Sequence, residues 1–162
     1  MLFDRLMAKW SSPRLLLQMA KYRWLDHHDL VRALDSLPCG SLSHHDRSGG
    51  HTVSRHIGKD TRYLKDRVNS GRARIASSFW NAHGARGAVA YAINTKFSDI
   101  VSWLSDPLRP NRLVLDVTFP IRSSVGYGFA QHLGLHCNYR QIKVVLERVS
   151  SVDFFIVTAF PR

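Results

Sequence analysis

The chain has 162 residues, which is enough for one domain with a hydrophobic core, or for one domain with a helical appendage, and too few for two full-sized domains. Apolar residues make up 44% of it and aromatic residues 10%, which excludes an intrinsically disordered chain. The net charge of +11 is concentrated after residue 50, where 16 Lys and Arg face seven acidic residues, and this excess favours a polyanionic partner, nucleic acid first and an anionic membrane surface or an acidic protein next.

The first 37 residues have helical patterning. Phe3, Leu6 and Trp10 recur at helical spacing, and Ser12-Pro13 is a cap residue followed by proline at the first helical position. A break at residues 37–41 is followed by a polar run to Gly50, which predicts a loop or a domain boundary. We therefore divide the chain into a helical lead-in, residues 1–42, which could be a delivery remnant or a docking element, and a main domain, residues 43–162.

The main domain begins with helical signals and ends with strand signals. Short helices are predicted over 51–57 and after Asp60, which is a plausible N-cap. They are followed by one strand and two more helices, over 75–80, 85–94 and 97–104. Residues rich in β-branched and aromatic side chains then predict strands over 112–119, 142–149 and 152–159. Helices before strands, without regular alternation, indicate an α+β fold with an antiparallel sheet.

The acidic and sulfur-containing residues exclude several kinds of chemistry. Glu147 is the only glutamate, and the aspartates lack the close pairing that two-metal nucleases and glycosidases use. Cys39 and Cys137 have no zinc-ligand spacing, and their separation neither requires nor excludes a disulfide. No metal site and no cofactor are predicted. Charged residues within the first ten positions interrupt any signal-peptide pattern, and no stretch is apolar enough to anchor the chain in a membrane.

The remaining catalytic side chains are those of metal-free phosphodiester cleavage in RNA. The ribose 2′-hydroxyl is a built-in nucleophile, so the enzyme needs a base, a cation for the phosphorane charge and an acid. Histidine and arginine suit these roles, and the segment from Gly49 to Lys59 contains His51 and His56 beside two cations. Five residues apart on one helix, the two histidines would point about 140° apart, which predicts that they do not share one role. Each could equally be a helix cap or a surface residue.

Several short blocks in order resemble the RNase A-like toxin domain at the C-termini of bacterial contact-dependent growth inhibition and other polymorphic toxin proteins. The blocks are Gly50-His51-Thr52-Val53, Arg55-His56-Ile57-Gly58-Lys59, Leu64 with Asp66-Arg67-Val68, Ala76-Ser77-Ser78-Phe79, Ile100 with Trp103-Leu104, Val144-Val145-Leu146, and Val157-Thr158-Ala159-Phe160-Pro161. The resemblance implies a kidney-shaped fold like that of pancreatic ribonuclease without its disulfides, metal-independent RNA cleavage, and neutralisation by a cognate immunity protein.

The resemblance also implies roles for individual residues. His56 matches the family's active-site histidine, Arg67 its arginine and Thr158 its threonine on the last strand. An alternative register gives those first two roles to His51 and Arg62.

The family usually has tyrosine two residues after the threonine, and this chain has Phe160. Thr158 and Phe160 alternate on a strand and so face the same side, where the ring could stack on a base. Lys59 and Arg62 complete the predicted substrate-binding set.

With this resemblance, we expect a ribonuclease toxin that forms a 2′,3′-cyclic phosphate and inhibits competitor bacteria. The expected partners are RNA, with tRNA as one candidate, and an acidic immunity protein. The expected place of action is the cytoplasm of the target bacterium, after export or delivery. The alternatives are a non-catalytic module that binds single-stranded RNA on the same fold, and a secreted protein whose basic surface serves only an acidic protein partner.

Overall fold

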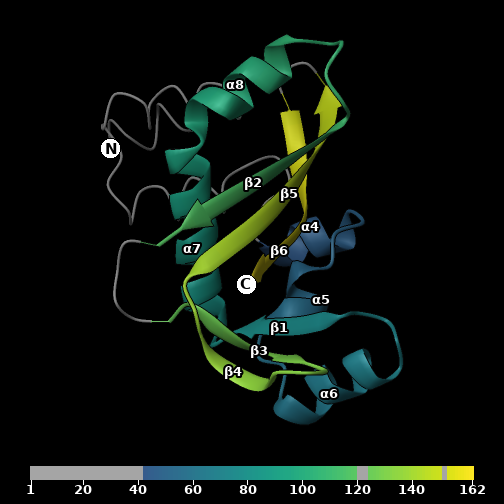
Figure 1. Ribbon diagram of the computed structural model, residues 1–162. Coiled ribbons are helices and arrows are strands. Elements are labelled where there is room, and N and C mark those ends of the chain that lie inside the picture. The colour runs from purple at the N-terminus through teal and green to yellow at the C-terminus, as the bar shows by residue number, and fades with distance from the viewer. Residues whose placement is uncertain (1–41, 120–123, 151–152) are drawn as a thin grey trace.

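The computed structural model describes residues 42–119, 124–150 and 153–162 (Figure 1). Helices α4 (Leu42–Arg47), α5 (Thr52–His56) and α6 (Thr61–Asn69) come first, followed by β1 (Ile75–Phe79), α7 (Ala82–Thr95) and α8 (Phe97–Ser105). The chain then forms β2 (Arg112–Thr118), β3 (Gly126–Ala130), β4 (Gly134–Tyr139), β5 (Gln141–Ser150) and β6 (Asp153–Pro161). The α+β class predicted from the sequence is therefore confirmed.

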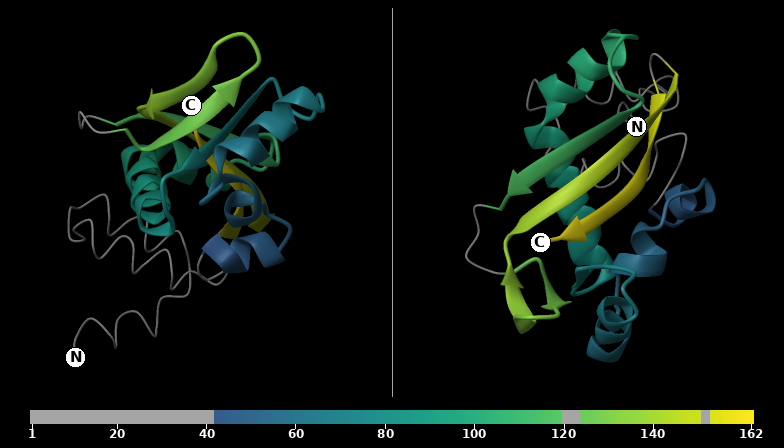
Figure 2. Two further views of the ribbon diagram at one scale, coloured as in Figure 1. Left: turned by 90° about the horizontal axis from the view of Figure 1, so that it is seen from below. Right: turned by 45° about the vertical axis from the view of Figure 1, so that its right-hand side comes forward.

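The strands form two antiparallel sheets instead of the single sheet expected. One has the order β2-β5-β6 and the other the order β1-β3-β4. Figure 2 shows the three strands of the first sheet side by side in its right-hand view. Strands β3 and β4 were not predicted because their strand pattern is weak. Gly126 and Gly128 alternate in β3, and four of the six residues of β4 are exposed, with no alternation of apolar and polar side chains.

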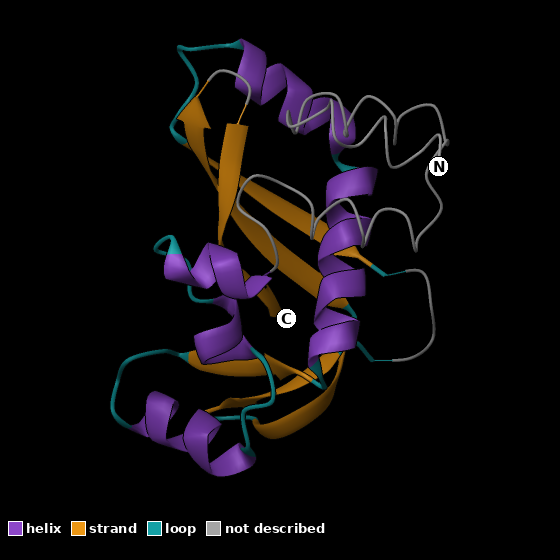
Figure 3. Cartoon of the chain, turned by 180° about the vertical axis from the view of Figure 1, so that it is seen from behind, coloured by secondary structure: helices purple, strands orange, loops and turns teal. Residues whose placement is uncertain are grey.

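The main core lies between helix α7 and the β2-β5-β6 sheet (Figure 3). α7 can approach the sheet closely because its buried face is mostly alanine. α8 adds Phe97, Ile100, Trp103 and Leu104, and the indole N–H of Trp103 donates to the carbonyl of Pro110 at 2.7 Å. The two helices predicted over 85–94 and 97–104 are thus confirmed, and each buries the apolar face that the sequence pattern indicated.

The polar run before Gly50 forms helix α4 and not the predicted loop. Leu42 and His45 are buried one turn apart, and the Nδ1 atom of His45 accepts a hydrogen bond from the backbone N–H of Ile156 on β6 at 3.2 Å. This packing against a distant strand stabilises a helix that the local sequence does not predict. The lead-in helices predicted for residues 1–37 lie outside the described residues, so the division at residue 42 stays a prediction.

The remaining predicted elements follow the sequence closely. Asp60 is the N-cap of α6, and its side chain accepts a hydrogen bond from the N–H of Tyr63 at 2.7 Å. Cys137 is exposed on β4, and Cys39 lies outside the described residues. Within the described part of the chain, no helix is both long and apolar enough to cross a membrane.

Candidate active site

A pocket of about 400 Å³ brings most of the predicted site residues together. Its lining residues come from α6, the two β-sheets and the region of α5, and they are His51, His56, Arg67, Ile75, Ser77, Thr158, Phe160, Pro161 and Arg162. All four predicted catalytic residues and the predicted stacking residue line this one pocket. Of the predicted substrate-binding residues, Lys59 and Arg62 do not line it.

Helix α5 is held against strand β6 by backbone contacts. The N–H of His51 donates to the carbonyl of Val157 at 2.9 Å, and the N–H of Ala159 donates to the buried hydroxyl of Thr52 at 2.9 Å. These two bonds flank Thr158 in the sequence, so they fix the histidines of the α5 region relative to the threonine of β6. The positioning role of Thr52 was not predicted, because its partner Ala159 lies 107 residues further along the chain.

Contacts with α4 and β6 also fix the first turn of α5 and the glycine before it. The carboxylate of Asp46 accepts the N–H groups of Val53 at 3.1 Å and Ser54 at 2.7 Å, and so caps the helix from α4. Gly50 passes so close to β6 that a Cβ atom there would lie 2.6 Å from the carbonyl oxygen of Ile156 and 2.8 Å from that of His45. The glycine of the sequence motif is therefore required by close backbone approach.

His56 has a defined tautomer. It is 8% exposed, and its Nδ1 lies 2.9 Å from the backbone carbonyl oxygen of Ser77. Because a carbonyl only accepts, Nδ1 carries the proton, and Nε2 of the neutral ring is left as an acceptor. Burial, together with the charges of Arg67 and other neighbouring basic groups, lowers the pKa of His56 to about 4, against the opposing effect of the Ser77 hydrogen bond. At neutral pH this ring is uncharged and able to take a proton.

His51 lies beside His56, although on one ideal helix the two side chains would point apart. The two rings have centroids 6.2 Å apart. His51 precedes α5 and has a non-helical φ of −153°, so the 140° separation of an ideal helix does not apply. Burial, and next the charge of Arg55, lower the pKa of His51, while Asp46 raises it. The pocket thus contains two histidines in different environments.

Two polar atoms in the pocket are buried without a hydrogen-bond partner among the described residues. They are Nη1 of Arg67 and Oγ1 of Thr158. The guanidinium of Arg67 lies over the ring of Tyr63 in a cation–π contact, with its Cζ 5.9 Å from the ring centroid. Leaving such groups unsatisfied costs about 1–3 kcal/mol each, and an oxyanion would satisfy both.

Phe160 packs against His56. Its ring stacks on that of His56, with centroids 5.2 Å apart and planes 29° apart. The alternation of Thr158 and Phe160 along β6 brings both into the pocket, as the sequence predicted. One face of the phenyl ring is therefore engaged with the histidine.

Lys59 and Arg62 lie outside the pocket. Nζ of Lys59 is 5.4 Å from the ring centroid of Tyr63, the same ring that Arg67 contacts, and Arg62 is exposed on α6. Arg162, which the sequence analysis did not single out, lines the pocket and forms an ion pair with Asp116, Nη1 to Oδ1 at 3.5 Å. Its position directly after the terminal Val157–Pro161 block was the available signal.

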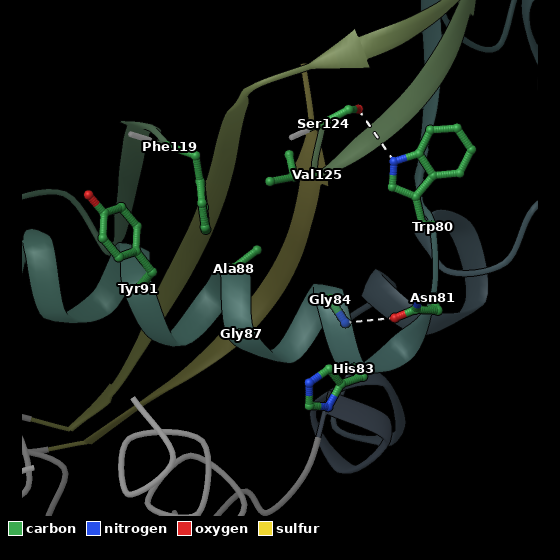
Figure 4. Close-up of a pocket in the computed structure, with 10 residues that line it drawn as sticks. All are labelled: Trp80, Asn81, His83, Gly84, Gly87, Ala88, Tyr91, Phe119, Ser124 and Val125. Carbon is green, nitrogen blue, oxygen red and sulfur yellow. Dashed lines mark hydrogen bonds between the residues drawn. The ribbon is translucent and has the colours of Figure 1, made fainter. Parts of the chain in front are cut away.

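A second pocket, of about 470 Å³, has a different character (Figure 4). It lies along α7, and its lining residues are Trp80, Asn81, His83, Gly84, Gly87, Ala88, Tyr91, Phe119, Ser124 and Val125. The indole N–H of Trp80 donates to the hydroxyl of Ser124 at 3.3 Å. The described residues of this lining include one histidine and no Lys, Arg, Asp or Glu, whereas the first pocket combines two histidines with two arginines, so phosphate chemistry fits the first pocket better.

Within residues 42–119, 124–150 and 153–162, no three His, Cys, Asp or Glu side chains gather in a way that could hold a metal ion.

Comparison with known proteins gives two matches. The family model described as the bacterial CdiA-CT RNAse A domain matches residues 50–161. Among solved structures, a crystal structure of a CdiA-CT/CdiI complex from Y. kristensenii 33638 is similar, with a TM-score of 0.62 and 24% sequence identity over 70% of this chain and 99% of that chain. No curated protein matches. The likeness in structure supports an RNase A-like fold.

Proposed function

Because this chain belongs to the family of bacterial CdiA-CT RNAse A domains, we propose that it cleaves RNA without a metal ion, by transesterification to a 2′,3′-cyclic phosphate. Membership confirms the resemblance noted in the sequence and makes the chain a ribonuclease toxin domain of the contact-dependent growth inhibition type. The pocket itself supports this mechanism, because it contains a neutral histidine with a free Nε2, a second histidine beside it, and an arginine whose buried Nη1 has no hydrogen-bond partner.

His56 acts as the general base in this proposal. Its free Nε2 accepts the proton of the ribose 2′-hydroxyl, and the resulting O2′ attacks the adjacent phosphorus. The lowered pKa keeps the ring unprotonated at neutral pH, and the Ser77 carbonyl stabilises the imidazolium that forms. His56 also faces the same pocket as Arg67, whereas Arg62 does not, which favours this register over the alternative one.

His51 supplies the second proton transfer. As the P–O5′ bond breaks, a protonated His51 gives its proton to the leaving O5′, so that one histidine gains a proton and the other loses one. Burial lowers the pKa of His51 in the free protein, and the negative charge of a bound phosphate raises it again. RNA binding therefore prepares the acid at the step in which it is needed.

Arg67 and Thr158 stabilise the charge that develops on phosphorus. The unpartnered Nη1 and Oγ1 are donors already placed and dehydrated, so they need little reorganisation to bind phosphorane oxygens. Phe160 keeps His56 in position by stacking and offers its remaining surface to a base. Lys59 and Arg62 extend the positive surface beyond the pocket, where they meet RNA phosphates.

The biological setting follows from the family. The similar Y. kristensenii domain was solved with CdiI, and we propose that this chain likewise binds an immunity protein. An acidic partner fits the +9 charge after residue 50, because it would compete with RNA for one cleft. Residues 43–162 would act in the cytoplasm of the target bacterium after delivery, with residues 1–42 as a lead-in.

The decisive experiment is incubation of total RNA with the protein in excess EDTA. Cleavage to products with 2′,3′-cyclic phosphate ends is expected. His56→Ala and Arg67→Ala should each lower the rate about a hundredfold or more, while His83→Ala and Arg109→Gln, which lie outside the pocket, should not.

Other results would point elsewhere. RNA binding without cleavage would favour the non-catalytic binding module, and absence of both would leave an acidic protein as the partner. An inactive His51→Ala beside an active His56→Ala would move the base to His51.

A further inference from the structure

A third pocket, of about 390 Å³, adjoins the active-site pocket. It lies where the segment before β1 meets the turn between β3 and β4, and its lining residues are Arg74, Ile75, Ala130, Gln131, His132 and Leu133. Ile75 lines both this pocket and the active-site pocket, and its backbone pairs with Ala130 of β3. Ile75 therefore separates the two pockets and contributes to the lining of both.

The lining combines exposed apolar surface with groups suited to a nucleotide. Ile75 is 56% exposed and Leu133 82% exposed, although both carry large apolar side chains. Arg74 offers a guanidinium for phosphate, and Gln131 and His132 offer polar atoms for the edges of a base. None of the described residues that line this pocket is acidic, so none of them repels a polyanion.

We propose that this pocket binds one nucleotide of single-stranded RNA next to the scissile phosphate. The base packs on Ile75 and Leu133, and the adjoining phosphate meets Arg74. Because Ile75 lines both pockets, the nucleotide in this pocket would be a neighbour of the one in the active site. This inference rests on the proposed ribonuclease function and assigns it an extended substrate.

The binding test uses protein that cannot cleave. In a His56→Ala background, fluorescence anisotropy measures the affinity for an eight-nucleotide single-stranded RNA. Adding Arg74→Gln with Leu133→Ala should weaken binding about tenfold to a hundredfold, through loss of a phosphate contact and of base packing.

The matched control is Arg109→Gln with Leu108→Ala. It removes one arginine and one leucine, 93% exposed, from the connection between α8 and β2, at the far end of the molecule from β1 and β3 (Figure 1). The control should change affinity less than about twofold, because surface changes away from the site are nearly neutral. Equal affinity of both double variants in folded protein would overturn the proposal.

A second measurement separates this pocket from the chemistry. In protein with His56 intact, hydrolysis of a mononucleoside 2′,3′-cyclic phosphate needs only one nucleotide in the active site. The Arg74→Gln, Leu133→Ala variant should keep the kcat and KM of that reaction and raise the KM for the eight-nucleotide RNA. A fall in kcat on the mononucleotide would instead show that the pocket variant disturbs the active site. If the protein with His56 intact does not cleave RNA, the proposed function fails. The anisotropy result then still decides whether this pocket binds RNA.

Discussion

Acidification should destabilise this protein through its buried histidines, and His56 is the one that links stability to activity. Burial lowers its pKa to about 4 from the ordinary 6.5. In the unfolded chain the ring binds a proton near pH 6.5, so between pH 6.5 and about 4 the unfolded state holds more protons than the folded state. The stability contributed by the neutral ring is therefore complete above pH 6.5 and is lost as the pH falls through about 4.

The size of this effect follows from the two pKa values. At 1.36 kcal/mol per pKa unit, the difference between 6.5 and about 4 corresponds to about 3 kcal/mol for His56. His45, whose pKa burial also lowers to about 4, adds a contribution of similar size. His51, whose pKa burial also lowers, adds to the same dependence. His56→Ala removes one of these contributions, so the stability of that variant should fall less steeply as the pH is lowered.

Urea unfolding at pH 7 and at pH 4.5 measures the loss, and proton NMR of the imidazole Cε1–H measures the titration of His56 directly. Comparing the pH dependence of each protein, and not the absolute stabilities, cancels the cavity that His56→Ala leaves. A His56 that titrates near 6.5, or a variant whose pH dependence equals that of the wild type, would refute the reasoning. Cleavage provides a second check. Because His56 stays unprotonated well below pH 6, kcat/KM should not fall through protonation of His56 until the pH approaches about 4.

Four further predictions concern the active-site pocket, the glycine that precedes α5, and RNA binding. Arg67→Ala should raise the pKa of His56, because the guanidinium charge lowers that pKa in the wild type. The pKa should still stay below 6.5, because burial is the larger cause of the shift, and NMR titration of the imidazole measures it. Phe160→Tyr should raise the cleavage rate about tenfold or more if a phenol can donate to the phosphate. If Phe160→Tyr leaves the rate unchanged and Phe160→Ala weakens RNA binding by about 1–3 kcal/mol, the ring acts by stacking alone. Gly50→Ala should lower the free energy of unfolding by about 1–3 kcal/mol in urea titrations, since its Cβ would overlap the Ile156 carbonyl. RNA affinity should fall steeply with salt in anisotropy titrations, and an affinity unchanged up to physiological ionic strength would contradict a phosphate-binding surface.

Much of the fold could be predicted because several elements carry their own signals. The cap at Asp60, the small-residue pattern of α7 and the β-branched runs of β2, β5 and β6 depend on residues close together in the chain. Helix α4 and strands β3 and β4 could not be predicted in the same way. They form because distant partners satisfy them, as when β3 pairs between β1 and β4, and local sequence does not record such partners.

The candidate site shows the same division. The resemblance to the toxin family pointed to His56, Arg67 and Thr158, which the fold brings into one pocket. It could not predict that the Ser77 carbonyl fixes the tautomer of His56, because 21 residues and a change of element separate the two. Nor could it predict that His51 joins them, since that depends on where α5 begins.

Phe160 shows why residue type and environment must be considered together. From the sequence, phenylalanine in place of the family's usual tyrosine means only that one hydroxyl is missing. In the fold the ring stacks on His56 and so contributes to the burial that lowers the pKa of that histidine. An apolar ring can do this as well as a phenol, so the substitution leaves the base intact and removes at most one donor to the phosphate. The unpartnered atoms of Arg67 and Thr158 remain available for that phosphate, which is why we expect this chain to be active.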